Sequence, residues 1–291
     1  MQELDDQQIW ELISAIEDEM LADGLDPKER HFHLPVKAME RLGYSSFALS
    51  GPNEPALLRH IRAIHQTLYR AKDVAVGGLH GGAFMFRGIA AEVRVPLFFG
   101  SVQIHPFEHN DLSLRQKEWL ASHPEQVEAY VATFCDIFDF SACLYLFDGY
   151  ERPPDGAMHL LNLAAFQLQG AGATLCAAFD ERGAIQSSLV GAELALKAAL
   201  AGNGANDENL KGYGHDLQRL AKAVSNVYSE FDLVSVTARI RLLPKLVDNR
   251  YSTQQPSRME TGDIVMACQH IAGAVARALT GGSLRARLRS S

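Results

Sequence analysis

The chain has 291 residues, of which 47% are hydrophobic and 21% charged, and this composition excludes wholesale disorder and a fibrous protein. Its formal net charge is -8, so it has no broad electrostatic attraction for nucleic-acid phosphates, and RNA binding is not favoured. We find no apolar run with the roughly 20 residues of a membrane span, and the first residues do not resemble a signal peptide. We therefore expect a cytoplasmic protein without a membrane partner.

The first 71 residues are predicted to be mainly helical. Apolar residues over 4–23 recur at helical spacing between acidic residues, which indicates an amphipathic helix. Asp26 and Pro27 are typical of a helix cap followed by proline in the first turn, whereas Pro35 predicts a break before a helix over 36–42. A loop over 51–55 then precedes a helix over 57–71.

Glycines gather at residues 77–82, where the helical spacing ends. β-Branched and aromatic residues over 93–104 predict one or two short strands. The glycine-rich segment lacks the ending of a P-loop and the spacing of a dinucleotide-binding turn, so close packing of the backbone is the favoured interpretation. His80 and Arg87 are the ligand-binding candidates of this half of the chain.

Helical spacing returns at residues 114–120 and 124–140. The segment 152–156 (RPPDG) is predicted to be a linker, because paired prolines interrupt helices and strands alike. Further helices are expected over 158–175, 183–201, 215–228, 234–247 and 261–279. The predicted fold is thus mainly α with a small β component: an N-terminal α+β domain over 1–151, a helical bundle over 157–282 and a basic flexible tail over 283–291.

Three stretches of the C-terminal part resemble, in order, stretches of the HEPN domain. They are residues 192–197 (AELALK), 214–217 (GHDL) and 249–251 (NRY), the last ahead of a final helix whose apolar residues face the core. The resemblance covers residues 157–280. It implies a helical bundle that pairs through one face, and hence a homodimer, without a cofactor.

Active HEPN domains resemble metal-independent ribonucleases, and in them an arginine precedes a histidine by about four to six residues. The histidine moves the proton of the attacking 2′-hydroxyl, and the guanidinium offsets the negative charge on the phosphate. Arg250 lies in the expected neighbourhood, but no histidine follows it until His270. The resemblance therefore implies a non-enzymatic binding or regulatory protein of the kind found in prokaryotic defence and stress systems. The alternative is a ribonuclease with an altered site made of Arg250, Tyr251 and His215.

Glu193 and Lys197 stand one helical turn apart and have two open interpretations. They either line a cleft that binds a small ligand or a protein partner, or form an ion pair on the helix surface. His215 likewise either joins a site or serves the start of a helix. His105 and His109 match the His-x-x-Glu-His order of inverted zinc peptidases, but the proline at 106 prevents the rings from sharing a helix face, so no metal site is expected.

Overall fold

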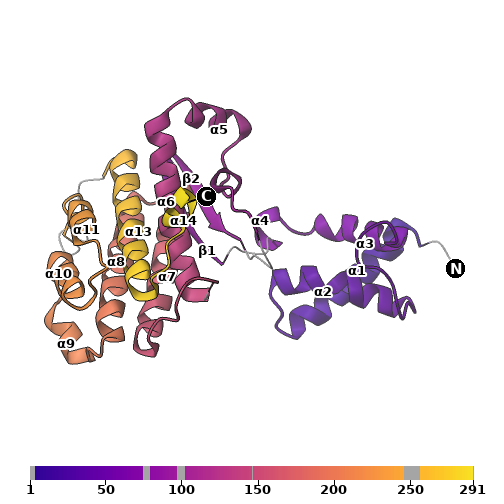
Figure 1. The fold of residues 1–291 in the computed structure, drawn as a ribbon. Helices are drawn as coiled ribbons and strands as arrows, with labels where there is room; N and C mark the ends of the chain where they lie inside the picture. Colours follow the sequence, from indigo (N-terminus) through magenta and orange to yellow (C-terminus); the bar gives the residue numbers. More distant parts are fainter. Residues whose placement is uncertain (1–3, 75–78, 97–101, 146, 246–255, 291) are drawn as a thin grey trace. The chain divides into compact units, whose positions relative to one another are not determined.

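The computed structural model describes residues 4–74, 79–96, 102–145, 147–245 and 256–290. Most of these residues are helical, and within them two strands pair into one small sheet (Figure 1). The predicted mainly α fold with a small β component is therefore confirmed. The contacts between residues divide the chain into two compact units, Met1–Gly77 and Gly78–Ser291. The boundary that the sequence predicts, at residues 152–156, lies inside the second of these units.

The first unit is a small helical bundle. Its helices are α1 (Asp6–Ala22), α2 (Pro27–Arg41), α3 (Ala56–Gln66) and the short α4 (Ala71–Val74). The apolar stripes of α1, α2 and α3 meet in one core, which includes Ile13, Leu34 and Ile61. The predicted cap at the start of α2 is confirmed, because the Asp26 carboxylate accepts hydrogen bonds from the amides of residues 28 and 29.

Helix α2 continues through Pro35, and the predicted break at this residue is therefore wrong. A proline inside a helix costs about 3 kcal/mol, because it removes one amide donor and crowds the preceding turn. In α2, however, Leu34, Pro35, Ala38 and Met39 are all buried, and a single large apolar side chain contributes about 1.5–3 kcal/mol on burial. Packing of this face therefore outweighs the local cost of the proline.

A buried polar cluster ties the helices of the first unit together. The Glu17 carboxylate accepts hydrogen bonds from the Tyr69 hydroxyl at 2.6 Å and Arg30 Nε at 2.9 Å, and it contacts His65 Nε2 at 2.7 Å. The His65 ring is fully buried, and burial lowers its pKa although Glu17 raises it in part. The cluster therefore joins α1 and α2 to α3 and the residues after it.

The sheet of the second unit is an antiparallel hairpin of β1 (His80–Phe86) and β2 (Ile89–Val95). Arg87 and Gly88 form its two-residue turn, and both have positive φ, 51° and 83°. A turn of this kind matches the right-handed twist of the strands, and it favours glycine at one of its two positions. Every residue of β1 is buried, which identifies it as a strand covered on both faces.

Close packing around β1 explains the glycine at position 82. A Cβ on Gly82 would lie 2.5 Å from Gln269 Oε1, and a Cβ on Gly172 would lie 2.9 Å from the carbonyl carbon of Gly82. The Gln269 side chain also accepts from the Ala83 amide and donates to the Ala83 carbonyl, each at 2.8 Å. Gly82 therefore packs tightly against helix residues, as the sequence predicts, whereas Gly77 and Gly78 lie outside the described residues.

The second unit is mainly helical. In chain order its helices are η1 (Pro106–Glu108), α5 (Leu114–Ala121), α6 (Pro124–Tyr145), α7 (Asp155–Ala177), α8 (Glu181–Gly202), α9 (Asp207–Gly212), α10 (Leu217–Val227), α11 (Leu233–Ile240), α13 (Arg258–Thr280) and α14 (Leu284–Ser290). Helix α8 packs against α7, α13 and α10 (Figure 1). By length and composition alone α8 could cross a membrane, and 67% of its apolar window is buried in this unit.

The sequence predicts a flexible tail from residue 283, and the structure instead has a helix there, α14. Leu284 is buried, and its amide donates to Asp139 Oδ1 at 2.7 Å. The Arg287 guanidinium donates to the Asp148 carbonyl at 3.0 Å and lies over the Tyr150 ring. Helix α14 thus forms because it contacts α6 and the segment after α6, although its own composition is typical of a solvated terminus.

Burial of His80 makes the stability of the second unit depend on pH. Burial lowers the pKa of this ring from 6.5 to about 4, so the unfolded chain binds the proton more readily. The free energy of unfolding should be full above about pH 6.5 and fall by about 1.4 kcal/mol per pH unit below it. Urea unfolding followed by Trp119 fluorescence, in a Trp10→Phe background, measures this dependence.

A His80→Gln variant is the control, because glutamine does not titrate. At about pH 4.5 the wild type should have lost about 2–3 kcal/mol more than the variant, relative to pH 7. Equal losses of unfolding free energy in the two proteins would contradict a buried, neutral His80 ring.

Candidate functional site

Three of the predicted site residues meet where α8 lies beside the start of α10. Glu193 and Lys197 stand one turn apart on α8, and Lys197 Nζ lies 2.6 Å from Glu193 Oε1. His215 precedes α10, and its Nδ1 lies 2.8 Å from Glu193 Oε2. The residue after it, Asp216, is the N-cap of α10 and accepts from the Arg219 amide at 3.0 Å. Capping of α10 thus holds the histidine against the carboxylate.

Glu193 is the buried member of this group. Its side chain is 9% exposed and that of Lys197 is 16% exposed, whereas the His215 side chain is 58% exposed. A carboxylate in an apolar setting requires partners for its charge, and each Glu193 oxygen has one. An ionised carboxylate only accepts hydrogen bonds, so His215 donates from Nδ1 and its Nε2 is left as an acceptor. The bond to the buried carboxylate therefore positions the exposed ring and, in its neutral form, favours the tautomer with the proton on Nδ1.

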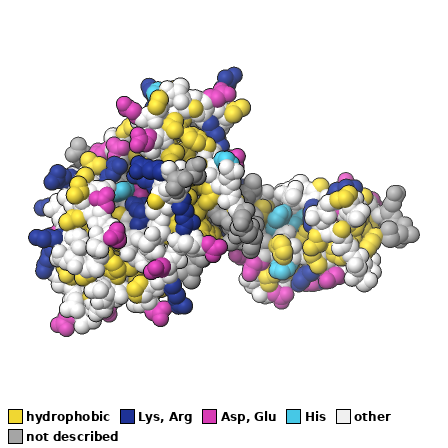
Figure 2. Space-filling view, viewed as in Figure 1, with side chains coloured by type: hydrophobic (Ala, Val, Ile, Leu, Met, Phe, Trp, Pro, Cys, Tyr) yellow, Lys and Arg dark blue, Asp and Glu magenta, His cyan; other side chains and the backbone are white. Residues whose placement is uncertain are grey.

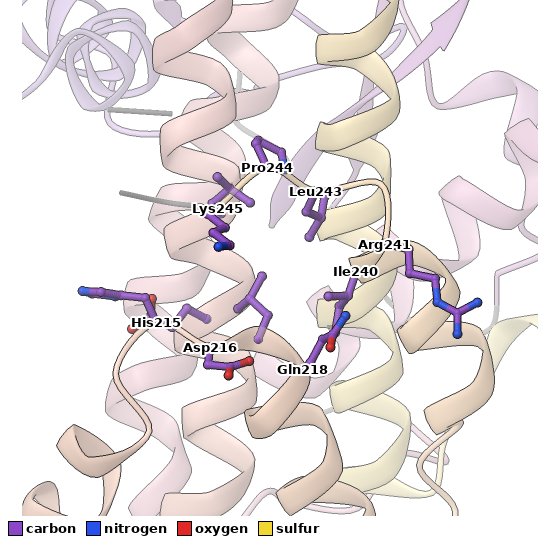
Figure 3. A pocket seen from close by; sticks show the side chains of 11 residues that line it. His215, Asp216, Gln218, Ile240, Arg241, Leu243, Pro244 and Lys245 are labelled. Carbon is purple, nitrogen blue, oxygen red and sulfur yellow. The ribbon is translucent and has the colours of Figure 1, made fainter. Parts of the chain in front are cut away.

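A pocket of about 660 Å³ opens beside this group (Figure 3). Its apolar lining comes from Leu189 of α8, Leu217 of α10, Ile240 of α11 and Leu243 after α11. Glu193, His215, Gln218 and Lys245 supply polar atoms at its wall and rim, and Lys245 makes no ion pair with any residue that the structure describes. Volumes of about 300–1,000 Å³ with an apolar wall and a few polar groups are typical of small-ligand sites.

The charged residues of this pocket are not equally available to a ligand. Asp216 is occupied by its capping bond, and Glu193 is held by Lys197 and His215. Figure 3 shows the Arg241 side chain extending away from the other labelled residues. Figure 3 shows the His215 ring extending outward on the opposite side, so the polar groups left to contact a ligand are the Gln218 amide and the Lys245 ammonium group.

The other sequence candidates lie elsewhere. His80 begins β1, is 3% exposed and packs against the Phe140 ring, whereas Arg87 occupies the turn at the far end of that strand, over Trp119. His105 and His109 flank η1 at opposite ends, and the His109 ring stacks on Phe134. In the described part of the chain no group of three or more metal-ligating side chains occurs.

Arg250 and Tyr251 lie outside the described residues, so the structure does not test the convergence on which the ribonuclease alternative depends. Sequence reasoning missed Gln218 and Lys245. Gln218 could have been found from its position in the first turn of the helix that His215 precedes. Lys245 follows a proline in a loop, and no local pattern indicates that this loop returns to α8.

No protein-family model, no curated protein and no solved structure matches this chain. The assignment of a function therefore depends on the site itself and on the three stretches that resemble the HEPN domain.

Proposed function

We propose that the second unit is a HEPN-like binding module that holds a small ligand in the pocket beside Glu193, and that it binds this ligand without transforming it. The pocket itself supports the proposal most directly, because it joins an apolar wall to a few polar groups whose positions are fixed by buried contacts. A ligand that fits has an apolar body and one anionic group. The apolar body would contact Leu217, Ile240 and Leu243, and the anionic group would contact Lys245.

The HEPN resemblance gains support from the contact between two of its three stretches. Glu193 and His215, which are 22 positions apart, join residues 192–197 to residues 214–217 at 2.8 Å. This is the arrangement expected if the two stretches belong to one site rather than to unrelated helices. A regulatory role in defence or stress, in which the module responds to a ligand or a protein partner, is part of the same proposal.

We propose that two copies of the chain pair through α7 to form a homodimer. Between residues 156 and 177 the helix has no Asp, Glu, Lys or Arg, so its exposed face is uncharged. Phe166 on this face is 71% exposed, and Phe179 just after the helix is 89% exposed. Large exposed aromatic side chains on an uncharged face are typical of an interface that is covered in the assembled protein.

A second candidate function, a ribonuclease with an altered site, is favoured by the bond between Glu193 and His215. A carboxylate that holds Nδ1 leaves Nε2 able to accept a proton, which is the arrangement of a general base. The net charge of -8 argues against it, and Figure 2 shows basic side chains interspersed with acidic and uncharged ones on the visible face of the second unit. Binding without chemistry is therefore the better supported function.

Filling the pocket, or removing its cation, should weaken ligand binding. Phenyl phosphate and benzoate serve as probes, because each joins an apolar ring to one anionic group, and saturation-transfer NMR measures their affinity. We expect Leu243→Trp, which fills the pocket, and Lys245→Met, which removes the cation, each to weaken binding by about tenfold or more.

Leu242→Trp is the matched control, since Leu242 is 54% exposed and lies outside the pocket lining. Its affinity for both probes should equal that of the wild type. Failure of the wild type to bind either probe, or equal affinities in the two tryptophan variants, would contradict the proposed function.

If two copies pair through α7, a charge placed on the exposed face of this helix should separate them. The wild type should elute as a dimer in size-exclusion chromatography with light scattering, and Phe166→Glu should elute as a monomer, because the carboxylate would be desolvated in the interface. Phe32→Glu is the control, since Phe32 in the first unit is equally exposed at 71%. Dissociation by both variants, or by neither, would exclude α7 as the interface.

The ribonuclease alternative predicts metal-independent cleavage. Incubation of the protein with mixed single-stranded and structured RNA in EDTA should give no cleavage if our proposal holds. Cleavage that is lost in His215→Ala and kept in His159→Ala, a change of an exposed histidine on α7, would instead establish the second candidate.

A further inference from the structure

A serine, a histidine and an aspartate from three helices form a second polar group in the second unit. The Oγ of Ser235, in the first turn of α11, lies 2.6 Å from His270 Nε2. The Nδ1 of the same ring, on α13, lies 2.8 Å from Oδ2 of Asp136 on α6. The histidine thus contacts the hydroxyl with one nitrogen and the carboxylate with the other.

The direction of these hydrogen bonds follows from the anchoring of Asp136. Arg277 NH1 donates to Asp136 Oδ1 at 2.8 Å and to Asp139 Oδ2 at 2.9 Å, so a guanidinium anchors the carboxylate. The ionised carboxylate accepts from His270 Nδ1, and the neutral ring must then accept at Nε2. The Ser235 hydroxyl is the donor to that nitrogen, which is the arrangement that activates a serine for attack.

Burial and access suit a reactive hydroxyl. The Asp136 and His270 side chains are 10% and 11% exposed, so both are held in fixed orientations by surrounding atoms. Ser235 is partly exposed, and its neighbours Asp232 and Val234 are exposed. None of the three residues lines the pocket beside Glu193. Ser235 therefore lies at the partly exposed start of α11, outside that pocket.

We propose that Ser235 is a nucleophile that takes the acyl group of small carboxylic esters, with His270 as its general base and Asp136 as the residue that orients the ring. Ser235 Oγ forms a bond to the ester carbonyl carbon while its proton moves to His270 Nε2. The alcohol then leaves with that proton, which gives an acyl-serine. Water releases the acid by the same two steps, with its proton passing through His270.

The start of α11 supplies one group for the negative oxygen of this step. Amides in the first turn of a helix have no partner within the helix. The Ser235 amide donates to Asp232 Oδ1 at 2.9 Å and is therefore occupied. The Leu233 amide donates to the Phe231 carbonyl at 2.8 Å, so the Val234 amide is the first-turn donor left among the described residues. One donor instead of two predicts slow turnover and favours esters with good leaving groups. The proposal goes beyond ligand binding at Glu193.

Labelling with a fluorophosphonate tests the proposal directly. The probe should attach to Ser235 with loss of fluoride, identified by mass spectrometry, and p-nitrophenyl acetate should be hydrolysed slowly. Ser235→Ala should abolish both reactions. His270→Gln should slow the labelling of Ser235 by about 100-fold or more, the usual loss for a general base.

Ser225→Ala is the matched control, because Ser225 is a partly exposed helical serine whose hydroxyl donates to the Lys222 carbonyl. It should leave both reactions unchanged. Circular dichroism and melting temperatures verify that each variant is folded. If His270→Gln does not fold, Asp136→Asn decides: its labelling rate should fall by about tenfold or more, because the ring loses the carboxylate that orients it. Absence of label on Ser235, or a labelling rate that neither variant lowers, would overturn the proposal.

Discussion

Burial of the Glu193 carboxylate in the middle of α8 is the constraint on which the arrangement of the candidate site depends. A charge in an apolar setting is tolerated only where partners compensate it, and here Lys197 and His215 each contact one oxygen. Lys197 comes from the same helix, so it adds no long-range restraint. His215 comes from the segment before α10, and its bond to Glu193 therefore fixes where α10 begins and where the wall of the pocket lies.

The same rule operates between α6 and α13. Asp136 and Asp139 of α6 are buried, and Arg277 contacts both at 2.8 and 2.9 Å. Burial raises the pKa of Asp139, and the Arg277 charge, the Leu284 amide and the Tyr150 hydroxyl offset part of that effect. The two groups of buried acids thus fix α10 against α8 and α6 against α13. In both, an oriented histidine is a consequence of satisfying a carboxylate.

Local signals predicted much of the fold. Apolar spacing located most helices, Asp26 and Pro27 marked a helix start, and the glycines before Ala83 indicated close backbone packing. The errors have one physical cause, since packing with distant residues overrides local preference: α2 continues through Pro35 because that face is buried, and α14 is ordered by contacts with α6. At the site, helical spacing predicted the Glu193 and Lys197 pair. No sequence pattern could indicate that Asp136 meets His270, because 134 positions separate them.

The tautomer of His215 tests the role of Glu193 most directly. The ¹⁵N chemical shifts of its ring, measured at a pH where the imidazole is neutral, distinguish a proton on Nδ1 from one on Nε2. The account predicts a proton on Nδ1 in the wild type and a shift toward Nε2 in Glu193→Gln, because the amide no longer holds the Nδ1 proton as an anion does. The same mixture of tautomers in both proteins would contradict the claim that this buried carboxylate orients the site.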